Sequence, residues 1–324
     1  MILCLGLTPT VQRSMTFDRV SIDEVNRAVD VKDYASGKSP NVARILRTLG
    51  ADPLAVGFAG GERGRFLLED MAKAGIKLDF VTIPDATRLC TTVIDRSNAT
   101  ATELVEEHAV VSPAAWAEME RKLRALLPQS KLWIFSGSLP PKAPQDFYAR
   151  FIPLAKEHGA RLILDTRGEP LKLSLAHDQF IVKLNRDELS ATLGGALETE
   201  DSIVQAARQI APVGGATIVT RGAQGAVASD GQRAWRIVAP KITAVSPIGS
   251  GDAFAAGLGL GLLRGMSMPE ALVMGCACGS ANAMTPLAGH MEYADFERLR
   301  KQVTVTEICQ LKEAIERRDA KTQR

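Results

Sequence analysis

Small residues and one carboxylate stand together where a loop leads into an apolar stretch. Gly249, Ser250 and Gly251 precede Asp252, and Ala253–Leu263 follows as a predicted buried helix. Backbone N–H groups at the start of a helix, together with the helix dipole, attract anions, so we call Gly249–Gly251 the anion turn. A carboxylate at its mouth suits a general base beside a transferred phosphoryl group. An ordinary N-cap after a glycine turn explains Asp252 equally well, and this stretch alone leaves both interpretations open.

A second group of polar residues opens another predicted helix. Asn185 and Glu188 are three residues apart, so their side chains lie on one side of that helix, and Lys183 comes just before them. These residues would bring an amide, a carboxylate and an ammonium to a polyphosphate, and Glu188 would hold Mg²⁺ directly or through water. The alternative is an N-cap asparagine followed by first-turn acids, which the helix dipole favours by itself.

Three basic residues are candidates for holding an anionic substrate. Gly37–Ser39 resembles the end of a P-loop, but Lys32 stands where that motif requires its first glycine, so we reject the motif. Lys38, flanked by small residues at a helix start, would still contact an anionic group. Arg27 and Arg88 carry guanidinium groups, which suit bidentate phosphate contacts.

Four short apolar runs would place polar residues along one edge of a sheet. The runs are Leu132–Phe135, Leu162–Leu164, Phe180–Val182 and Thr217–Val219. Helical patterns between them are typical of a parallel sheet covered on both faces. Polar or glycine-rich segments follow the runs at once, beginning at Ser136, Asp165, Lys183 and Thr220. Because ligands of open α/β sheets bind outside the carboxyl ends of the strands, we expect these segments and the anion turn to share one cleft.

The rest of the chain completes one α/β domain over residues 1–324. Ile2–Leu7 is a predicted first strand, and the irregular segment 8–35 is predicted to form a small sheet or flap. An amphipathic helix is expected at Asn41–Leu49, ended by Gly50. A C-terminal helix and a charged tail are expected over 305–324.

Composition limits the partners and the compartment. The 324 residues carry a net charge of +2 and give no sign of nucleic-acid or membrane binding. Five cysteines without metal-ligand spacing indicate reduced thiols in a cytoplasmic protein. The N-terminus lacks the basic region and long apolar core of a signal peptide.

Two signatures resemble those of the ribokinase-like (PfkB) carbohydrate kinases, and the resemblance covers about residues 2–303. The first is Ala35–Arg44, followed by Gly57–Gly61, and the second is Ser246–Gly257. Three segments lie between them in family order: Ser136–Pro140, Lys183–Glu188 and Thr220–Gly225. The chain is most similar to the branch of 1-phosphofructokinases and tagatose-6-phosphate kinases. The resemblance implies a three-layer α/β sandwich with a mostly parallel central sheet and a β-sheet lid formed by about 8–35 and 87–108.

The resemblance also implies a role for each matching residue. Asp252 matches the catalytic base, and the anion turn (Gly249, Ser250 and Gly251) matches the anion hole. The implied substrate-binding residues are Gln12, Arg27, Gly37, Lys38, Asn41, Arg88 and Ser138. The implied nucleotide-binding residues are Lys183, Asn185, Thr220, Gly222, Gln224 and Gly225. Mg²⁺ would accompany ATP near Asn185 and Glu188, and a monovalent cation such as K⁺ would bind near Ser246 and the 285–289 loop.

The implied activity is an ATP-dependent phosphoryl transfer to a ketohexose phosphate such as fructose 1-phosphate, tagatose 6-phosphate or fructose 6-phosphate. Gln12 replaces the aspartate usual in the branch, and Ser36 and Ser39 replace glycines. We expect the two added serine side chains to narrow the sugar pocket. Two alternatives stay open: a kinase for an unphosphorylated sugar or polyol, and a non-catalytic sugar or nucleotide sensor. A homodimer through the lid is a further arrangement that the resemblance implies.

Overall fold

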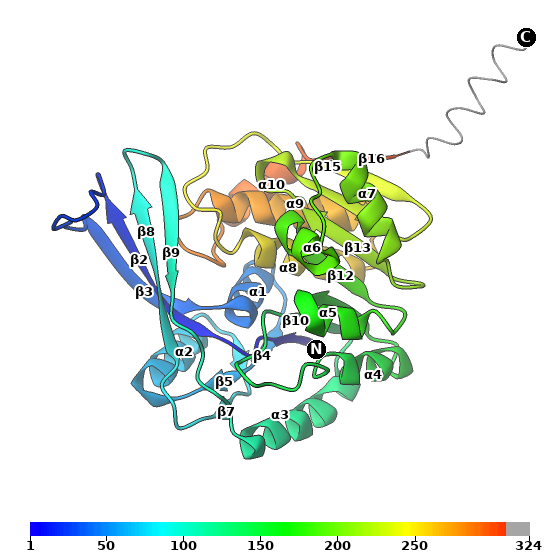
Figure 1. The fold of residues 1–324 in the computed structure, drawn as a ribbon, viewed down its shortest axis with the longest axis horizontal. Helices are drawn as coiled ribbons and strands as arrows, with labels where there is room; N and C mark the ends of the chain where they lie inside the picture. Colours follow the sequence, from blue (N-terminus) through cyan, green and yellow to red (C-terminus); the bar gives the residue numbers. More distant parts are fainter. Residues whose placement is uncertain (309–324) are drawn as a thin grey trace, which may run out of the picture.

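A ten-stranded sheet runs through the part of the chain that the computed structural model describes, residues 1–308 (Figure 1). Its strand order is β16-β15-β14-β13-β12-β11-β10-β1-β4-β6. The bounds are β1 Ile2–Leu5, β4 Pro53–Val56, β6 Lys77–Leu78, β10 Leu132–Ser136, β11 Arg161–Asp165, β12 Ile181–Asn185, β13 Ala216–Thr220, β14 Ala226–Ser229, β15 Ala234–Val238 and β16 Thr304–Glu307. All neighbours from β6 to β13 are parallel, and β14, β15 and β16 join antiparallel. The predicted α/β architecture with a mostly parallel sheet is therefore confirmed.

Helices cover both faces of this sheet, which explains the continuous apolar runs of its strands (Figure 1). Along β10, Leu132 and Ile134 join one apolar cluster, and Trp133 and Phe135 join the other. The first cluster includes residues of α1 Lys38–Thr48, α2 Gly61–Lys73, α8 Ser250–Leu263, α9 Met268–Ala283 and α10 Tyr293–Arg300. The second includes residues of α3 Pro113–Leu126, α4 Ile152–Glu157, α5 Gly168–Ser174, α6 Arg186–Leu193 and α7 Glu200–Gln209. Short 3₁₀ turns lie at Leu127–Gln129, Ala149–Phe151 and Gly222–Gln224.

The close packing of α8 against α9 depends on small residues. A Cβ on Gly257 would lie 2.7 Å from the Met274 carbonyl oxygen, and one on Gly275 would lie 2.9 Å from that of Phe254. Only glycine permits such an approach of the two backbones. The helix pair holds the N-terminus of α8, which carries the anion turn, against the carboxyl ends of β11 and β12.

A four-stranded sheet stands apart from the sandwich, at the left of Figure 1. Its order is β3 Asp30–Ser36, β2 Thr10–Phe17, β8 Arg88–Asp95 and β9 Thr100–Val105. We call it the small sheet, and its strands come from the two segments expected to form a lid. Its register places Gln12, Ser14, Tyr34 and Thr92 on one face, and Met15, Val31, Val93 and Leu104 on the other. Two further strands, β5 Phe58–Ala59 and β7 Val81–Thr82, pair separately.

Some boundaries differ from those expected. Helix α1 begins at Lys38 rather than Asn41, because Gly37 takes a left-handed φ of 95° that turns the chain directly into the helix. The C-terminal helix expected from residue 305 does not begin there, because Thr304–Glu307 pairs with β15 as β16. The remainder of that expectation, residues 309–324, lies outside the described residues. Within residues 1–308, no helix has the length and apolar character needed to span a bilayer.

Candidate active site

The anion turn forms the N-terminus of α8. Gly249 is the N-cap with a left-handed φ of 82°, and a Cβ there would lie 2.7 Å from the backbone nitrogen of Gly289. The Ser250 N–H donates to the carbonyl of Pro247, whereas the N–H groups of Gly251 and Asp252 have no hydrogen-bond partner among the described residues. Asp252 is the third residue of the helix and makes no capping bond, so its interpretation as an N-cap is wrong.

The carboxylate of Asp252 points instead at two side chains of α1. Its Oδ2 accepts a hydrogen bond from Asn41 Nδ2 at 2.8 Å, and its Oδ1 lies 3.1 Å from the Nζ of Lys38. All but 4% of Asp252 is buried. A buried carboxylate is tolerated when a cation and a hydrogen-bond donor meet it, and both partners here come from more than 200 residues earlier in the chain.

Asp165, at the carboxyl end of β11, links two lysines. Its Oδ2 lies 2.9 Å from Lys183 Nζ and 3.3 Å from Lys38 Nζ. Burial by itself would raise the pKa of Asp165, but the charges of Lys183 and Lys38 outweigh it and lower the pKa. Burial would likewise lower the pKa of Lys38, and the charges of Asp165 and Asp252 raise it instead. Alternating charges therefore run from Lys183 to Asp252 across the strand ends.

The loop after β10 shapes the wall beside Lys38. Gly137 has a left-handed φ of 104°, and a Cβ on it would lie 3.1 Å from the Cγ of Lys38. The Gly137 carbonyl accepts hydrogen bonds from the Tyr148 hydroxyl and the Thr166 hydroxyl, each at 3.1 Å. The loop therefore holds the lysine stem in place, while Ser138 beside it is exposed.

The segments proposed to contact a nucleotide lie at the ends of β12 and β13. Asn185 and Glu188 form a capping box, in which each side chain accepts a hydrogen bond from the other residue's backbone N–H at 2.8 Å. The structural alternative for this pair is therefore correct, and a binding role would be additional. Gly222 and Gly225 both have left-handed φ angles in the loop that follows Thr220. A Cβ on Gly225 would lie 2.0 Å from the Ile237 carbonyl oxygen, so the loop shape depends on glycine.

Residues of the small sheet lie on the other side of the cleft. Gln12 is buried, and its Nε2 donates to the Thr92 hydroxyl at 2.8 Å. Arg88 donates to the carbonyls of Thr8 and Glu106, while its buried Nε has no hydrogen-bond partner among the described residues. Arg27 is exposed in the loop between β2 and β3. No polar contact within residues 1–308 joins Arg27 to Lys38 or Asp252.

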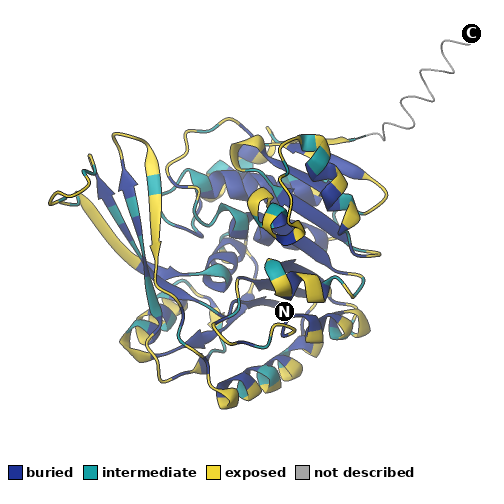
Figure 2. Ribbon diagram, viewed as in Figure 1, coloured by how far each residue is buried: buried dark blue, intermediate teal, exposed yellow. Residues whose placement is uncertain are grey.

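Sequence reasoning expected the segment beginning at Asp165 in the cleft, because it follows an apolar run, but gave neither Asp165 nor Glu103 a role of its own. Glu103 is an exposed residue of β9 in register with Thr92, and partial desolvation together with the Asp252 charge raises the pKa of its carboxyl although Arg88 opposes the shift. The residue pattern of β9 did not single out Glu103, because most residues of that strand are exposed (Figure 2).

The two serines that replace glycines do not narrow an open pocket floor. Ser36 and Ser39 are both buried. The hydroxyl of Ser36 donates to Asn41 Oδ1 at 3.0 Å, and that of Ser39 donates to the Val56 carbonyl at 3.3 Å. Both hydroxyls therefore serve internal hydrogen bonds.

The described residues fit Mg²⁺ that arrives with a nucleotide better than a resident metal. No group of three or more His, Cys, Asp or Glu side chains within residues 1–308 could hold a metal ion. Asp165 is already shared by two lysines, which leaves Glu188 as the carboxylate at the nucleotide side. Mg²⁺ in phosphate sites keeps several waters and takes one or two carboxylates, which this arrangement supplies.

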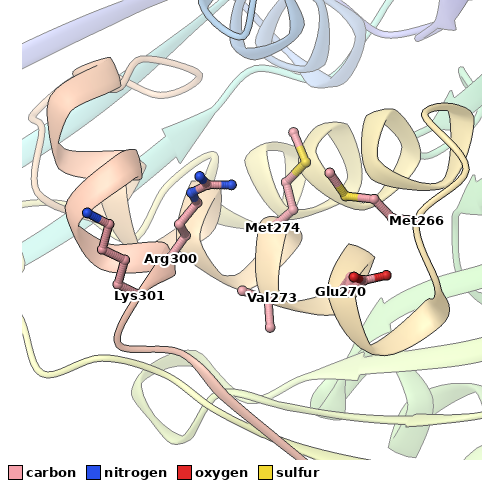
Figure 3. Close-up of a pocket in the computed structure, with 6 residues that line it drawn as sticks. All are labelled: Met266, Glu270, Val273, Met274, Arg300 and Lys301. Carbon is pink, nitrogen blue, oxygen red and sulfur yellow. The ribbon is translucent and has the colours of Figure 1, made fainter.

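A separate hollow of about 320 Å³ lies near the other end of α8 (Figure 3). Its lining residues are Met266, Glu270, Val273, Met274, Arg300 and Lys301. None of the candidate site residues contributes to it, so we assign the chemistry to the residues around Asp252 and Asp165 at the strand ends.

Comparisons with known proteins bear on the family and the fold. The family model described as pfkB family carbohydrate kinase matches residues 1–292. A tagatose-6-phosphate kinase from Staphylococcus epidermidis is 33% identical, over 95% of this chain and all of the relative. The structure of phosphofructokinase-2 from Escherichia coli in complex with potassium superposes with a TM-score of 0.85 at 26% identity, covering 93% of this chain and 98% of that one. A possible 1-phosphofructokinase from Thermotoga maritima shares the fold with a TM-score of 0.87 at 23% identity, covering 95% and 100%.

Proposed function

Because the chain belongs to the pfkB family of carbohydrate kinases, we propose that it transfers the γ-phosphoryl group of ATP to a hydroxyl of a ketohexose phosphate, with Asp252 as general base. The observation that carries the proposal is the buried Asp252 carboxylate at a helix start where the N–H groups of Gly251 and Asp252 have no hydrogen-bond partner within residues 1–308. A carboxylate so placed accepts a proton at the point where the neighbouring N–H groups neutralise negative charge.

The residues of the site divide the reaction between them. Asp252 takes the proton of the acceptor hydroxyl as the oxygen bonds to the γ-phosphorus, and the bond to the ADP oxygen breaks. The N–H groups of Gly251 and Asp252 stabilise charge on the transferred group, and Lys183 and Lys38 add positive charge on either side. Asn41 keeps the carboxylate oriented.

ATP would occupy the side of the cleft formed by the ends of β12 and β13. The proposed contacts are Lys183, Asn185, Thr220, Gly222, Gln224 and Gly225. Mg²⁺, held near Glu188 and Asn185 through water, would neutralise phosphate charge when bound. A monovalent cation near Ser246 and the 285–289 loop is proposed because the Escherichia coli relative was solved with potassium.

The acceptor would lie between α1 and the small sheet. Gln12, Gly37, Lys38, Asn41 and Ser138 would contact the sugar, and Arg88 and Arg27 its phosphate. The buried Nε of Arg88 has no hydrogen-bond partner within residues 1–308, which supports a phosphate subsite, because a guanidinium with a free donor suits an oxyanion. The name of the staphylococcal relative favours tagatose 6-phosphate within this class.

Two further properties are proposed from exposed apolar residues and from the cysteines. The outward face of the small sheet exposes Val31 and Leu104 by half or more, which supports a homodimer through this sheet. A cytoplasmic location remains a prediction from the reduced cysteines. Cys4, Cys90, Cys276 and Cys278 are free and buried.

A coupled assay of ADP release with MgATP tests the proposal. Tagatose 6-phosphate, fructose 6-phosphate, fructose 1-phosphate and the free ketohexoses are compared side by side. We expect strong turnover of one phosphosugar and a loss of roughly a hundredfold or more in Asp252→Asn. Turnover of free sugars alone would exclude the phosphate subsite. Turnover of Asp252→Asn at the wild-type rate would exclude the general base.

A further inference from the structure

Three buried side chains form a hydrogen-bonded chain that ends on Asp252. Ser36 Oγ donates to Asn41 Oδ1 at 3.0 Å, and Asn41 Nδ2 donates to Asp252 Oδ2 at 2.8 Å. The three residues expose only 2%, 3% and 4% of their surfaces. Burial removes water as a competing partner, so each hydrogen bond selects one orientation of the next side chain.

The direction of this chain is set by the chemistry of its members. An ionised carboxylate only accepts hydrogen bonds, so Asn41 must turn its Nδ2 toward Asp252. The Oδ1 of the amide then faces Ser36, where only a donor can meet it. The Ser36 hydroxyl supplies that donor, and a residue without a hydroxyl would leave the amide oxygen buried and unpartnered.

The backbone beside Ser36 is held from both sides by a partly buried ion pair. Ala35 donates its N–H to Asp70 Oδ2 at 2.9 Å, and its carbonyl accepts from Arg44 Nη1 at 3.0 Å. Arg44 and Asp70 also meet each other at 3.1 Å, joining α1 to α2. Because Arg44 lies one helical turn after Asn41, the same helix fixes both ends of the Ser36–Asn41 hydrogen bond.

We propose that Ser36 is a positioning residue for the reaction. Through Asn41 it holds the Asp252 carboxylate in the orientation that accepts the proton of the acceptor hydroxyl. This inference rests on the general-base role of Asp252 proposed above. Ser36 itself is buried behind Asn41 and acts through it, so its effect is expected in kcat rather than in the KM for MgATP.

A double-mutant cycle tests this inference in the coupled assay, with whichever of the three phosphosugars the wild-type enzyme turns over fastest. Ser36→Ala, Asn41→Ala and the double variant are compared with Ser39→Ala. The control removes a second buried hydroxyl three residues later, at the start of α1, and that hydroxyl donates to the Val56 carbonyl. We expect Ser36→Ala to lower kcat roughly three- to tenfold, the usual effect of one buried hydrogen bond, with KM for MgATP unchanged. Ser39→Ala should stay within about twofold of the wild type.

The decisive comparison is the effect of Ser36→Ala in the Asn41→Ala background. If Ser36 acts through Asn41, kcat changes by less than about twofold there. An equal loss of kcat in both backgrounds, or a Ser36→Ala enzyme as active as Ser39→Ala, would overturn the inference. The Asp252→Asn variant keeps the two proposals separate. An inactive Asp252→Asn with an unaffected Ser36→Ala removes only the role of Ser36, whereas a fully active Asp252→Asn removes the base itself.

Discussion

A Cβ placed on Gly251 would lie 2.6 Å from the Nζ of Lys183, so the lysine ammonium rests directly on the backbone of the anion turn. Lys183 cannot move aside freely, because it is buried and paired with Asp165 at 2.9 Å. The glycine therefore brings a positive charge and two unpartnered N–H groups to one point. This arrangement is what a transferred phosphoryl group requires.

Gly251→Ala separates this contact from helix stability. Alanine inside a helix is favoured over glycine by about 0.5–1 kcal/mol, whereas the new contact with Lys183 costs stability, so we expect only a small net change in the melting temperature. The displaced Lys183 ammonium should nevertheless lower kcat/KM for MgATP about tenfold. Gly195→Ala is the matched control, because a Cβ there meets nothing within 4 Å. The coupled assay measures the kinetics of both variants, and calorimetry measures their melting temperatures. Equal kinetics of Gly251→Ala and Gly195→Ala would contradict a role for the contact between Lys183 and the anion turn.

Asp165→Asn tests the carboxylate shared by Lys38 and Lys183. Removing its charge leaves the buried Lys183 ammonium without a carboxylate, while Lys38 keeps Asp252, and we expect a loss of about 3–5 kcal/mol in the free energy of unfolding. Adding Lys183→Met should restore part of that stability, because Lys183 is the buried ammonium that Asp165→Asn leaves without a carboxylate. Activity should stay low in both variants. Urea unfolding measures the first effect, and a double variant no more stable than Asp165→Asn would refute the shared-charge explanation.

Arg88→Ala tests the proposed phosphate subsite. Loss of a guanidinium that contacts a phosphate should raise the KM of the phosphosugar by about tenfold or more, with KM for MgATP unchanged. Arg63→Ala serves as the comparison, since Arg63 pairs with the nearby exposed carboxylate of Glu106 at 2.8 Å. Unchanged KM in Arg88→Ala would remove the subsite from the proposal.

His290 should make stability depend on pH. Burial, with the charge of Arg44, lowers the pKa of His290 from 6.5 to about 4. The folded state therefore favours the neutral imidazole. The contribution of neutral His290 to the stability of the folded state is complete above pH 6.5 and is lost as the pH falls toward 4. The loss is on the order of 3 kcal/mol at most. His290→Asn can still donate to the Ala288 carbonyl that Nδ1 now contacts at 3.0 Å, but it cannot ionise. Melting temperatures between pH 7 and pH 4 should fall less steeply in this variant, and equal slopes would show that His290 does not contribute.

Exposed apolar residues on the outward face of the small sheet predict that the protein forms a homodimer. Val31→Lys together with Leu104→Lys places charge on the outward face and should convert a homodimer to monomers. Light scattering after size exclusion measures the mass. Val213→Lys alters an exposed valine elsewhere and should leave the mass unchanged. A wild-type monomer would refute the dimer outright.

The sequence predicted the elements better than the contacts between them. The apolar runs located β10 to β13, and the small residues located the anion turn, because both patterns are local. The pairing of Lys38 with Asp165 joins positions 127 residues apart, and no spacing reveals it. Ser36 and Ser39 were expected to narrow a pocket, whereas both are buried, because the exposure of a side chain cannot be read from residue type. Asp252 allowed two interpretations until its partners on α1 were known.

The last described strand has a consequence for handling the protein. β16 lies beyond the matched residues 1–292 and covers the free edge of β15. Without it, the N–H and C=O groups of β15 would be open to pairing with the same strand of another molecule. Residues 304–307 end the described sheet in a short strand of mostly exposed residues, a form of edge that resists pairing with other molecules, so a chain shortened before β16 should aggregate more readily.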